Sequence, residues 1–339
     1  MLRGRAHAPA AALLLLFVAA TLSATFYQSR PLAAQASTGS SFPAVPFPFN
    51  SVRTEQEMAF ADDGTFVWCS AKAETAVAAG DELDIYIAKY DEATKSFSEP
   101  VNMGLAVNSA PDPDEPLRNG MDIEPWISPD GQRLYFRSNR LADSEACTEA
   151  NGKPCAPDTH WGGFASTKLF KSTKAADGTW STPEPLPFPI NSEYGEHCPM
   201  ERRDGKSLCF ASARPGGYGG DDIWCAAIND DGTYGDAVNM GAEINSAGME
   251  SHFHEHPTEG HVSFVSTRED DWGDIWTAKP DGAGGWLPPT RLKINTHGEQ
   301  EACPAFTPSG KLMYYFSTKN MPGSEPETMD IFVVANPVE

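Results

Sequence analysis

One pattern occurs five times along this chain of 339 residues, at intervals of roughly 50 residues, the range in which propeller repeats fall. Each copy begins with an acidic residue, passes through a turn with glycine, and continues into a β-type segment that ends in Ser and a basic residue. Most copies then contain Asp-Ile-aromatic. Because such a repeat gives four short strands, the sequence predicts an all-β fold: a five-bladed β-propeller of four-stranded antiparallel blades.

The ends of the pattern predict how the ring of blades closes. The last copy stops after its third strand-like segment, and the segment 42–51 resembles the end of an outer strand such as 186–192. We therefore expect the N-terminal strand to complete the last blade, which leaves no open sheet edge. The predicted blades are about 52–110, 111–192, 193–246, 247–296, and 297–339 together with 40–51.

The N-terminal segment has the features of a secretory signal. Arg3 and Arg5 precede an apolar stretch at 10–24, and small residues follow at Ala34 and Ala36. This arrangement predicts a signal peptide at 1–36 with cleavage after Ala36, one propeller domain at 37–339, and a secreted or periplasmic location. We expect no stable membrane insertion after cleavage, with an uncleaved anchor as the alternative.

The strongly acidic composition excludes one class of partner. The formal net charge is −22, and it becomes −25 when residues 1–36, with three arginines and no acid, are removed. Because nucleic acid requires a basic surface, we expect no nucleic-acid partner. Divalent metals, cationic ligands or basic proteins are compatible with this negative charge. The alternative is that the charge only keeps the protein soluble.

Four of the seven cysteines fall into two local pairs. Cys147 and Cys155 lie in the long insertion 141–166 of the second blade, where we expect a disulfide because the loop has no core of its own. Cys209 and Cys225 lie on adjacent predicted strands, where they either pair or are simply buried.

The five copies provide an internal control, since a residue present in every blade serves the blade. An acid opens each first strand, and a base closes each second strand; these are Glu55, Asp122, Glu196, Glu250 and Glu301, and Lys72, Arg140, Arg214, Arg268 and Lys319. Both sets are expected at one end of the disc, as ion pairs and loop caps.

One position, two residues into the first strand, differs between blades. Its occupants, Glu57, Glu124, Cys198, His252 and Cys303, all belong to residue types that ligate metals. His254 follows His252 on the same side by strand alternation, and so does His256. We predict that Glu124, Cys198, His252, His254 and Cys303 bind one divalent metal, Zn, Mn or Ca. Alternatively these side chains pack between blades. Cys69, which aligns with Phe136 and Phe210, is predicted to be a core residue.

The segments 128–140 and 214–224, with SPDG, LYF, S-x-R and RPGGYGGDDIW, resemble the WD40-like (PD40) repeat of TolB-type propellers. The resemblance covers nearly all of the chain after residue 36. It implies an extracytoplasmic propeller, a module that commonly binds proteins, cell-wall components or glycans. The repeat also resembles that of the oligogalacturonate lyases, a family that uses a metal site with histidines.

Two functional hypotheses follow. The first is an exported binding module whose top face recognises a glycan, cell-wall component or protein. Its candidate ligand-binding residues are His160, Trp161, Tyr218, Trp272, Arg140, Arg214 and Arg268.

The second is a metal-assisted hydrolase or lyase of a polysaccharide-type substrate, with Glu196 or Glu250 as general base at the central channel. A metal-free glycosidase is a weaker variant of this hypothesis. No nucleophile elbow of the G-x-S-x-G type is present in the sequence.

Overall fold

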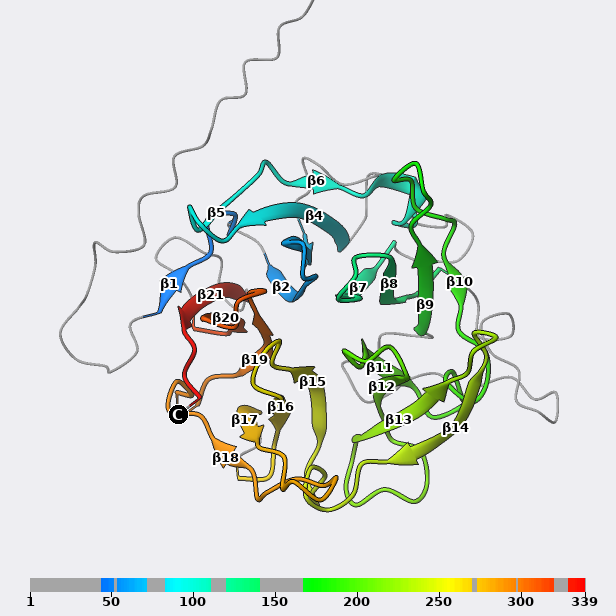
Figure 1. Ribbon diagram of the computed structural model, residues 1–339, viewed down its shortest axis with the longest axis vertical. Helices are drawn as coiled ribbons and strands as arrows, with labels where there is room; N and C mark the ends of the chain where they lie inside the picture. Colours follow the sequence, from blue (N-terminus) through cyan, green and yellow to red (C-terminus); the bar gives the residue numbers. More distant parts are fainter. Residues whose placement is uncertain are drawn as a thin grey trace, which may run out of the picture.

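Five antiparallel sheets surround a central axis, as the sequence predicts (Figure 1). The computed structural model describes residues 44–51, 54–71, 83–110, 120–140, 167–269, 273–296, 298–319 and 329–338. Their only helical element is the short 3₁₀ helix η1, Gly104–Ala106. Within these residues no helix is both long and apolar enough to cross a membrane. The predicted signal peptide, 1–36, lies outside the described residues.

Each blade runs outward from a first strand beside the axis. Blade 1 contains β2 (Glu55–Phe60), β3 (Thr65–Ser70), β4 (Asp84–Asp91), β5 (Ser96–Phe97) and β6 (Val101–Asn102). Blade 2 contains β7 (Asp122–Ile127), β8 (Arg133–Ser138), β9 (Lys168–Thr173) and β10 (Glu184–Pro185). Blade 3 contains β11 (Glu196–Glu201), β12 (Ser207–Ser212), β13 (Asp222–Ile228) and β14 (Tyr234–Asn239). Blade 4 contains β15 (Glu250–Glu255), β16 (Val262–Ser266), β17 (Asp274–Ala278) and β18 (Thr290–Arg291). Blade 5 contains β19 (Glu301–Phe306), β20 (Leu312–Ser317), β21 (Asp330–Ala335) and, from the N-terminal side, β1 (Val45–Pro46).

The predicted closure by the N-terminal strand is confirmed. Strand β1 pairs antiparallel with β21, with Val45 opposite Val333. The next residue but one, Phe47, is only 2% exposed, and its ring contacts Phe66 of blade 1 and Tyr314 of blade 5. The closing segment therefore joins the two ends of the described chain through backbone pairing and an aromatic cluster between blades.

Glycine has one repeated role in the blades. The turn between the first and second strands contains a glycine with φ between +69° and +79° in all five blades: Gly64, Gly131, Gly205, Gly260 and Gly310. Side-chain residues rarely adopt this conformation. At Gly64 a Cβ atom would also lie 2.4 Å from the Tyr90 carbonyl oxygen. This explains the glycine turn in the repeat.

Cys209 and Cys225 form a disulfide between the adjacent strands β12 and β13. The sequence allowed either a disulfide or two buried thiols at these positions, and the structure contains the disulfide. Disulfides persist in oxidising compartments, so the pair is compatible with the predicted extracytoplasmic location.

Candidate functional site

The five variable side chains meet at the axis. Glu57, Glu124, Cys198, His252 and Cys303, called the axial ring below, line one cavity together with His254. The centre of a water-sized sphere can occupy a volume of about 10 Å³ in this cavity. The cavity therefore has room for about one water molecule or ion. The predicted convergence of these side chains is therefore found in the structure, and Cys303 in addition packs in an apolar cluster with Met58 of blade 1 and Phe316 of blade 5, as the alternative predicts.

An unusual backbone geometry places the axial ring. All five residues have positive φ, between 47° and 55°, and Lys95 is the only other non-glycine described residue with this property. In every blade the pairing of the first two strands shifts register next to the ring residue. Such a bulge re-aims a side chain. The left-handed conformation costs about 1–2 kcal/mol at a non-glycine residue. The bulge belongs to the fold, whereas the chemistry of the side chain differs from blade to blade.

Hydrogen bonds link three of the ring side chains to the next blade. Glu57 Oε2 accepts the Glu124 backbone N–H at 2.7 Å, and Glu124 Oε2 accepts the Cys198 N–H at 2.5 Å. Cys303 Sγ accepts the Met58 N–H at 3.2 Å. These bonds fix the side chains around the cavity. They leave Glu57 Oε1 facing the His252 ring, 3.8 Å from its Nε2 atom.

Burial controls the charge of the ring. It raises the pKa of the Cys198 and Cys303 thiols well above the ordinary value, and the negative Glu124 and Glu57 raise it further. At Glu124 burial opposes ionisation, but the charge of Arg137, whose Nη1 lies 3.1 Å from Oε1, lowers the pKa. Burial followed by the charge of His252 lowers the His254 pKa to about 3. A bound divalent cation would instead lower the pKa of a cysteine thiol that it contacts and so favour the thiolate form.

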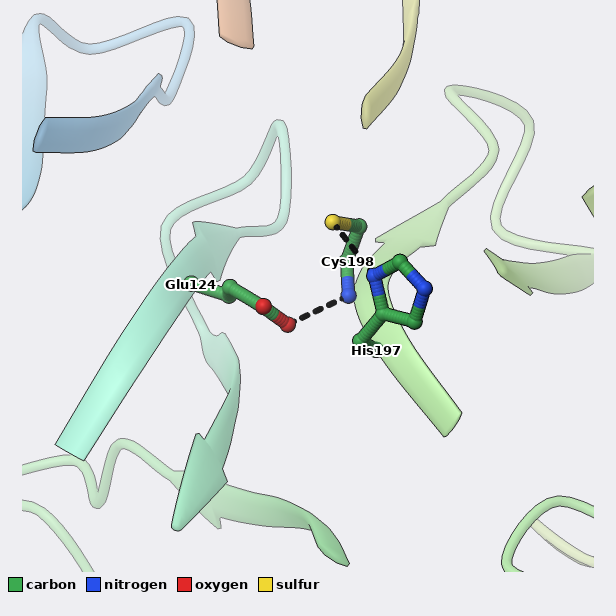
Figure 2. Close-up of side chains that lie close together, drawn as sticks. All are labelled: Glu124, His197 and Cys198. Carbon is green, nitrogen blue, oxygen red and sulfur yellow. Dashed lines mark hydrogen bonds between the residues drawn. The ribbon is translucent and has the colours of Figure 1, made fainter. Parts of the chain in front are cut away.

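Three donor atoms come closest on the side of blades 2 and 3. Figure 2 shows Glu124 from β7 facing His197 and Cys198 from β11, and one donor atom of each lies within 4.8 Å of the other two. His197 Nδ1 is 3.2 Å from Cys198 Sγ, and its Nε2 is 3.5 Å from Asp221 Oδ2. Burial works against a charged His197 ring, but its hydrogen bond to Asp221 and the charge of that carboxylate raise the pKa.

His197, Asp221 and Arg137 were missed by the sequence analysis. Strand alternation places His197 opposite Cys198, which excluded it from the predicted ligand set. The internal control would have found it, because the other blades carry Gln56, Ile123, Ser251 and Ala302 at this position. Asp221 is likewise unique, since Leu83, Thr167, Gly273 and Met329 occupy its place elsewhere.

The predicted alignment of Cys69 was wrong by one residue. Cys69 pairs with Gln56, as Arg137 pairs with Ile123, so Cys69 and Arg137 share one position. Each touches the ring carboxylate of its own blade: Cys69 Sγ lies 3.4 Å from Glu57 Oε2. The prediction that Cys69 is a core residue is confirmed, since it is fully buried in an apolar cluster with Met121 and Ile123.

His256 is also placed differently from the prediction. Its Nδ1 accepts the Glu259 N–H at 3.1 Å, and its Nε2 lies 3.1 Å from the Gly310 carbonyl oxygen. The ring packs on His261, 4.3 Å between centroids, and on Phe306. Strand β15 ends at Glu255, so His256 lies in the turn that follows, between blades 4 and 5 and not at the cavity.

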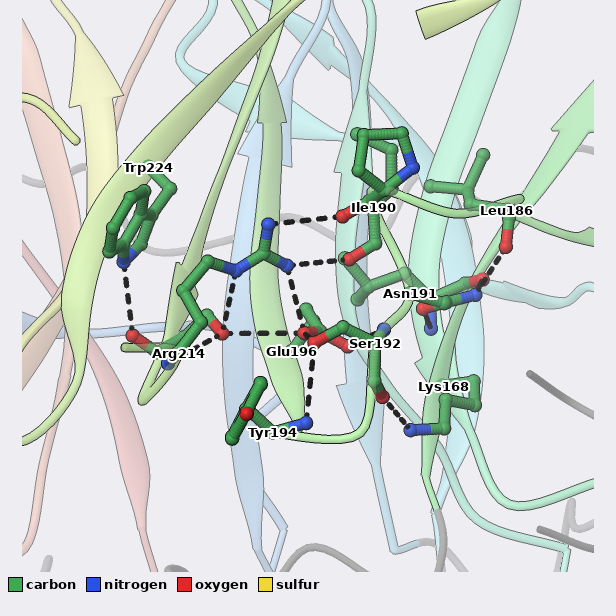
Figure 3. Close-up of polar contacts among 12 residues, drawn as sticks. Lys168, Leu186, Ile190, Asn191, Ser192, Tyr194, Glu196, Arg214 and Trp224 are labelled. Carbon is green, nitrogen blue, oxygen red and sulfur yellow. Dashed lines mark hydrogen bonds and ion pairs between the residues drawn. The ribbon is translucent and has the colours of Figure 1, made fainter. Parts of the chain in front are cut away.

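The acids shared by all blades have the predicted architectural role. Glu196 is 0% exposed, accepts hydrogen bonds from the Ser192 N–H and Oγ–H, and lies 2.9 Å from Arg214 Nη2 (Figure 3). Glu250 is equally buried and accepts the Ser246 N–H at 2.7 Å. Neither carboxylate lines the axial cavity, so the structure offers no support for either as a general base.

The predicted top-face residues are described only in part. Arg140, Arg214 and Arg268 are paired with shared acids of their blades. Tyr218 is 55% exposed. His160, Trp161, Trp272 and the predicted Cys147–Cys155 disulfide lie outside the described residues.

One end of the channel is crossed by a side chain. Arg203, in the turn after β11, places Nη2 2.5 Å from Asp62 Oδ1 of blade 1. Its backbone N–H donates to Glu255 Oε2 of blade 4 at 2.7 Å. Three blades are thereby tied together where the first strands end.

Comparison with protein-family models gave no match, and comparison with curated proteins gave no significant match. Solved structures do resemble the chain. An α-L-arabinofuranosidase from Lactobacillus brevis has a TM-score of 0.50 at 11% identity, covering 86% of this chain and 92% of that one. An endo-arabinase from Bacteroides thetaiotaomicron VPI-5482 has a TM-score of 0.50 at 12% identity, covering 88% and 99%. A putative TolB from Agrobacterium tumefaciens has a TM-score of 0.42 at 14% identity, covering 84% and 91%. At these identities the likeness to the first two structures, with a TM-score of 0.50, shows a shared fold.

Proposed function

We propose that this chain is an exported propeller that binds one transition-metal ion at its axial ring. It uses this ion to cleave a polysaccharide-type substrate, as a hydrolase or as a lyase. The observation that carries the proposal is the convergence of one potential ligand from each blade on a cavity with room for a single ion. The bulge present in all five blades belongs to the fold, so the support for a functional role comes from the differing side chains that it re-aims toward the axis.

The types of donor atom decide between the candidate metals. The ring and its neighbours offer thiol, imidazole and carboxylate groups together. Calcium takes oxygen ligands, and manganese also favours oxygen-rich sites. Zinc accepts sulfur, nitrogen and oxygen ligands in one tetrahedral site. We therefore select zinc among the three metals predicted from the sequence.

Zinc would supply a Lewis acid and a bound water with a lowered pKa. Glu57 is positioned as the general base, since its Oε1 atom faces the cavity and its Oε2 atom is held by the Glu124 N–H. Glu57 thus replaces Glu196 and Glu250 in the proposed role.

The substrate class is supported by the fold neighbours. The two solved structures with a TM-score of 0.50 described above are an arabinofuranosidase and an endo-arabinase. These activities belong to those proteins, and they make arabinan the first substrate to test here.

Metal analysis tests the proposal. After loading with Zn²⁺ and desalting, the chain is expected to retain about one zinc ion, because the cavity at the axial ring has room for a single ion. The double variant Glu124→Gln/Cys198→Ser is expected to retain almost none. Glu259→Gln is the matched control, because Glu259 belongs to a second His/Glu group away from the axis, with His256 and His261. Absence of zinc from the wild type, or equal retention by the double variant, would contradict the proposal.

A second candidate is glycan binding without chemistry, which the exposed aromatic ring of Tyr218 favours. Stacking of a sugar on this ring predicts that Tyr218→Ala weakens arabinan binding by about 10-fold, the effect of an aromatic contact worth roughly 1 kcal/mol or slightly more. Calorimetric titration with arabinan oligosaccharides checks this. Equal affinity of variant and wild type would remove Tyr218 from the binding surface.

A further inference from the structure

Resting on the proposed function, we infer that the metal is held off the axis by three ligands, Glu124, His197 Nδ1 and Cys198 Sγ, with a fourth position open toward Glu57. Asp221 then acts as a positioning residue for His197. This assigns the ligands to blades 2 and 3 and makes the other ring residues the surroundings of the reacting water.

Distance separates this set from the rest of the ring. Among the described residues, two groups of three potential ligands have donor atoms within 4.8 Å of one another: Glu124–His197–Cys198 and His256–Glu259–His261. The second group is unsuitable, because His256 already uses both ring nitrogens on backbone groups. The first group lines the axial cavity through Glu124 and Cys198.

The remaining ring residues are engaged elsewhere. Cys303 Sγ accepts the Met58 N–H at 3.2 Å and lies 4.0 Å from His254 Nε2. His252 Nδ1 is 2.9 Å from Ser251 Oγ. Cys198 Sγ also interacts with a backbone N–H of the next blade, that of His252, but it lies 3.2 Å from the His197 nitrogen that would bind beside it.

The surroundings of His197 match those of a metal-bound histidine. Its Nε2 atom faces the Asp221 carboxylate at 3.5 Å, and the two side chains are 4% and 3% exposed. Such a carboxylate holds the proton on Nε2 and so leaves Nδ1 as the ligand atom. Glu124 is oriented in a comparable way by Arg137 on Oε1 and by the Cys198 N–H on Oε2.

Charge is balanced in this arrangement. One carboxylate and one thiolate neutralise a divalent ion, and the imidazole remains neutral. Three protein ligands with a fourth position for water are typical of catalytic zinc sites, whereas structural zinc sites have four protein ligands. The inference therefore accounts for hydrolysis at a cavity too small for more than one ion.

Cobalt substitution and X-ray absorption test the ligand set. Co²⁺-loaded wild type is expected to show sulfur-to-cobalt charge-transfer absorption that is lost in Cys198→Ser and kept in Cys303→Ser, its matched control on the same ring. Asp221→Asn is expected to keep the absorption and weaken metal affinity by about 10- to 100-fold. X-ray absorption of the zinc-loaded wild type, which depends on no variant, is expected to show one sulfur at ~2.3 Å and nitrogen or oxygen ligands at ~2.0–2.2 Å.

The outcomes separate the two proposals. A wild type that takes up neither metal overturns both. Metal uptake with two sulfur ligands, or loss of the absorption in Cys303→Ser, overturns the three-ligand set and leaves the metal-binding function standing. Unchanged affinity in Asp221→Asn overturns the positioning role of Asp221.

Discussion

The Glu57→Gln variant is expected to lose hydrolysis of arabinan by about 10²- to 10⁴-fold, the usual contribution of a general base, while its zinc content stays at the wild-type level. Glutamine has nearly the same shape, and its amide oxygen can still accept the Glu124 N–H that Glu57 accepts at 2.7 Å. The side chain can no longer take a proton from water. The loss should therefore appear in kcat and in kcat/KM with little change in fold.

Reducing-end release by the zinc-loaded protein measures this effect, with metal content determined on the same samples. Glu259→Gln, whose side chain is 56% exposed in the wild type, is the matched control and should retain activity. Full activity in Glu57→Gln would show that Glu57 is not the general base. Loss of zinc along with activity would make Glu57 a ligand and not a base.

The second large effect concerns stability. Glu196→Ala is expected to lower the free energy of unfolding by about 3–5 kcal/mol, because it leaves the charge of Arg214 mostly buried without its partner. Arg214 lies 2.9 Å from Glu196 and contacts the carbonyl oxygens of Pro189 and Ile190 (Figure 3). The Ser192 N–H, which donates to Glu196 at 2.8 Å, also loses its acceptor.

Urea unfolding followed by tryptophan fluorescence measures the change. Glu184→Ala, at an exposed position of strand β10, is the control and should stay within about 0.5 kcal/mol of the wild type. A similarly small change in Glu196→Ala would show that the shared acid does not stabilise the blade as described.

The fold was predictable because every blade repeats the same local instructions. A glycine at each first turn, alternating apolar strands and, in four of the five blades, Asp-Ile-aromatic at the third strand agree with one another across the copies. The closure by β1 followed from the incomplete last copy. Agreement of local and global signals is what allows a sequence to specify one fold.

The candidate site was predictable only in part. Its ring positions followed from comparing blades, since Cys198 and His252 stand where repeats differ. The bulge could not be predicted in this way, because no glycine or asparagine occupies the ring positions to indicate a left-handed backbone conformation. Without the bulge, strand alternation separates His197 from Cys198, although their side chains lie 3.2 Å apart. Asp221 directly precedes another strand, β13, so its contact with His197 depends on tertiary register.

Anomalous X-ray diffraction from crystals grown with Zn²⁺ tests the central claim most directly. Data collected on both sides of the zinc absorption edge should show one strong peak in the axial cavity, bonded to Glu124, His197 and Cys198. Absence of a peak from the axial cavity, or a peak only at His256 and His261, would contradict the account.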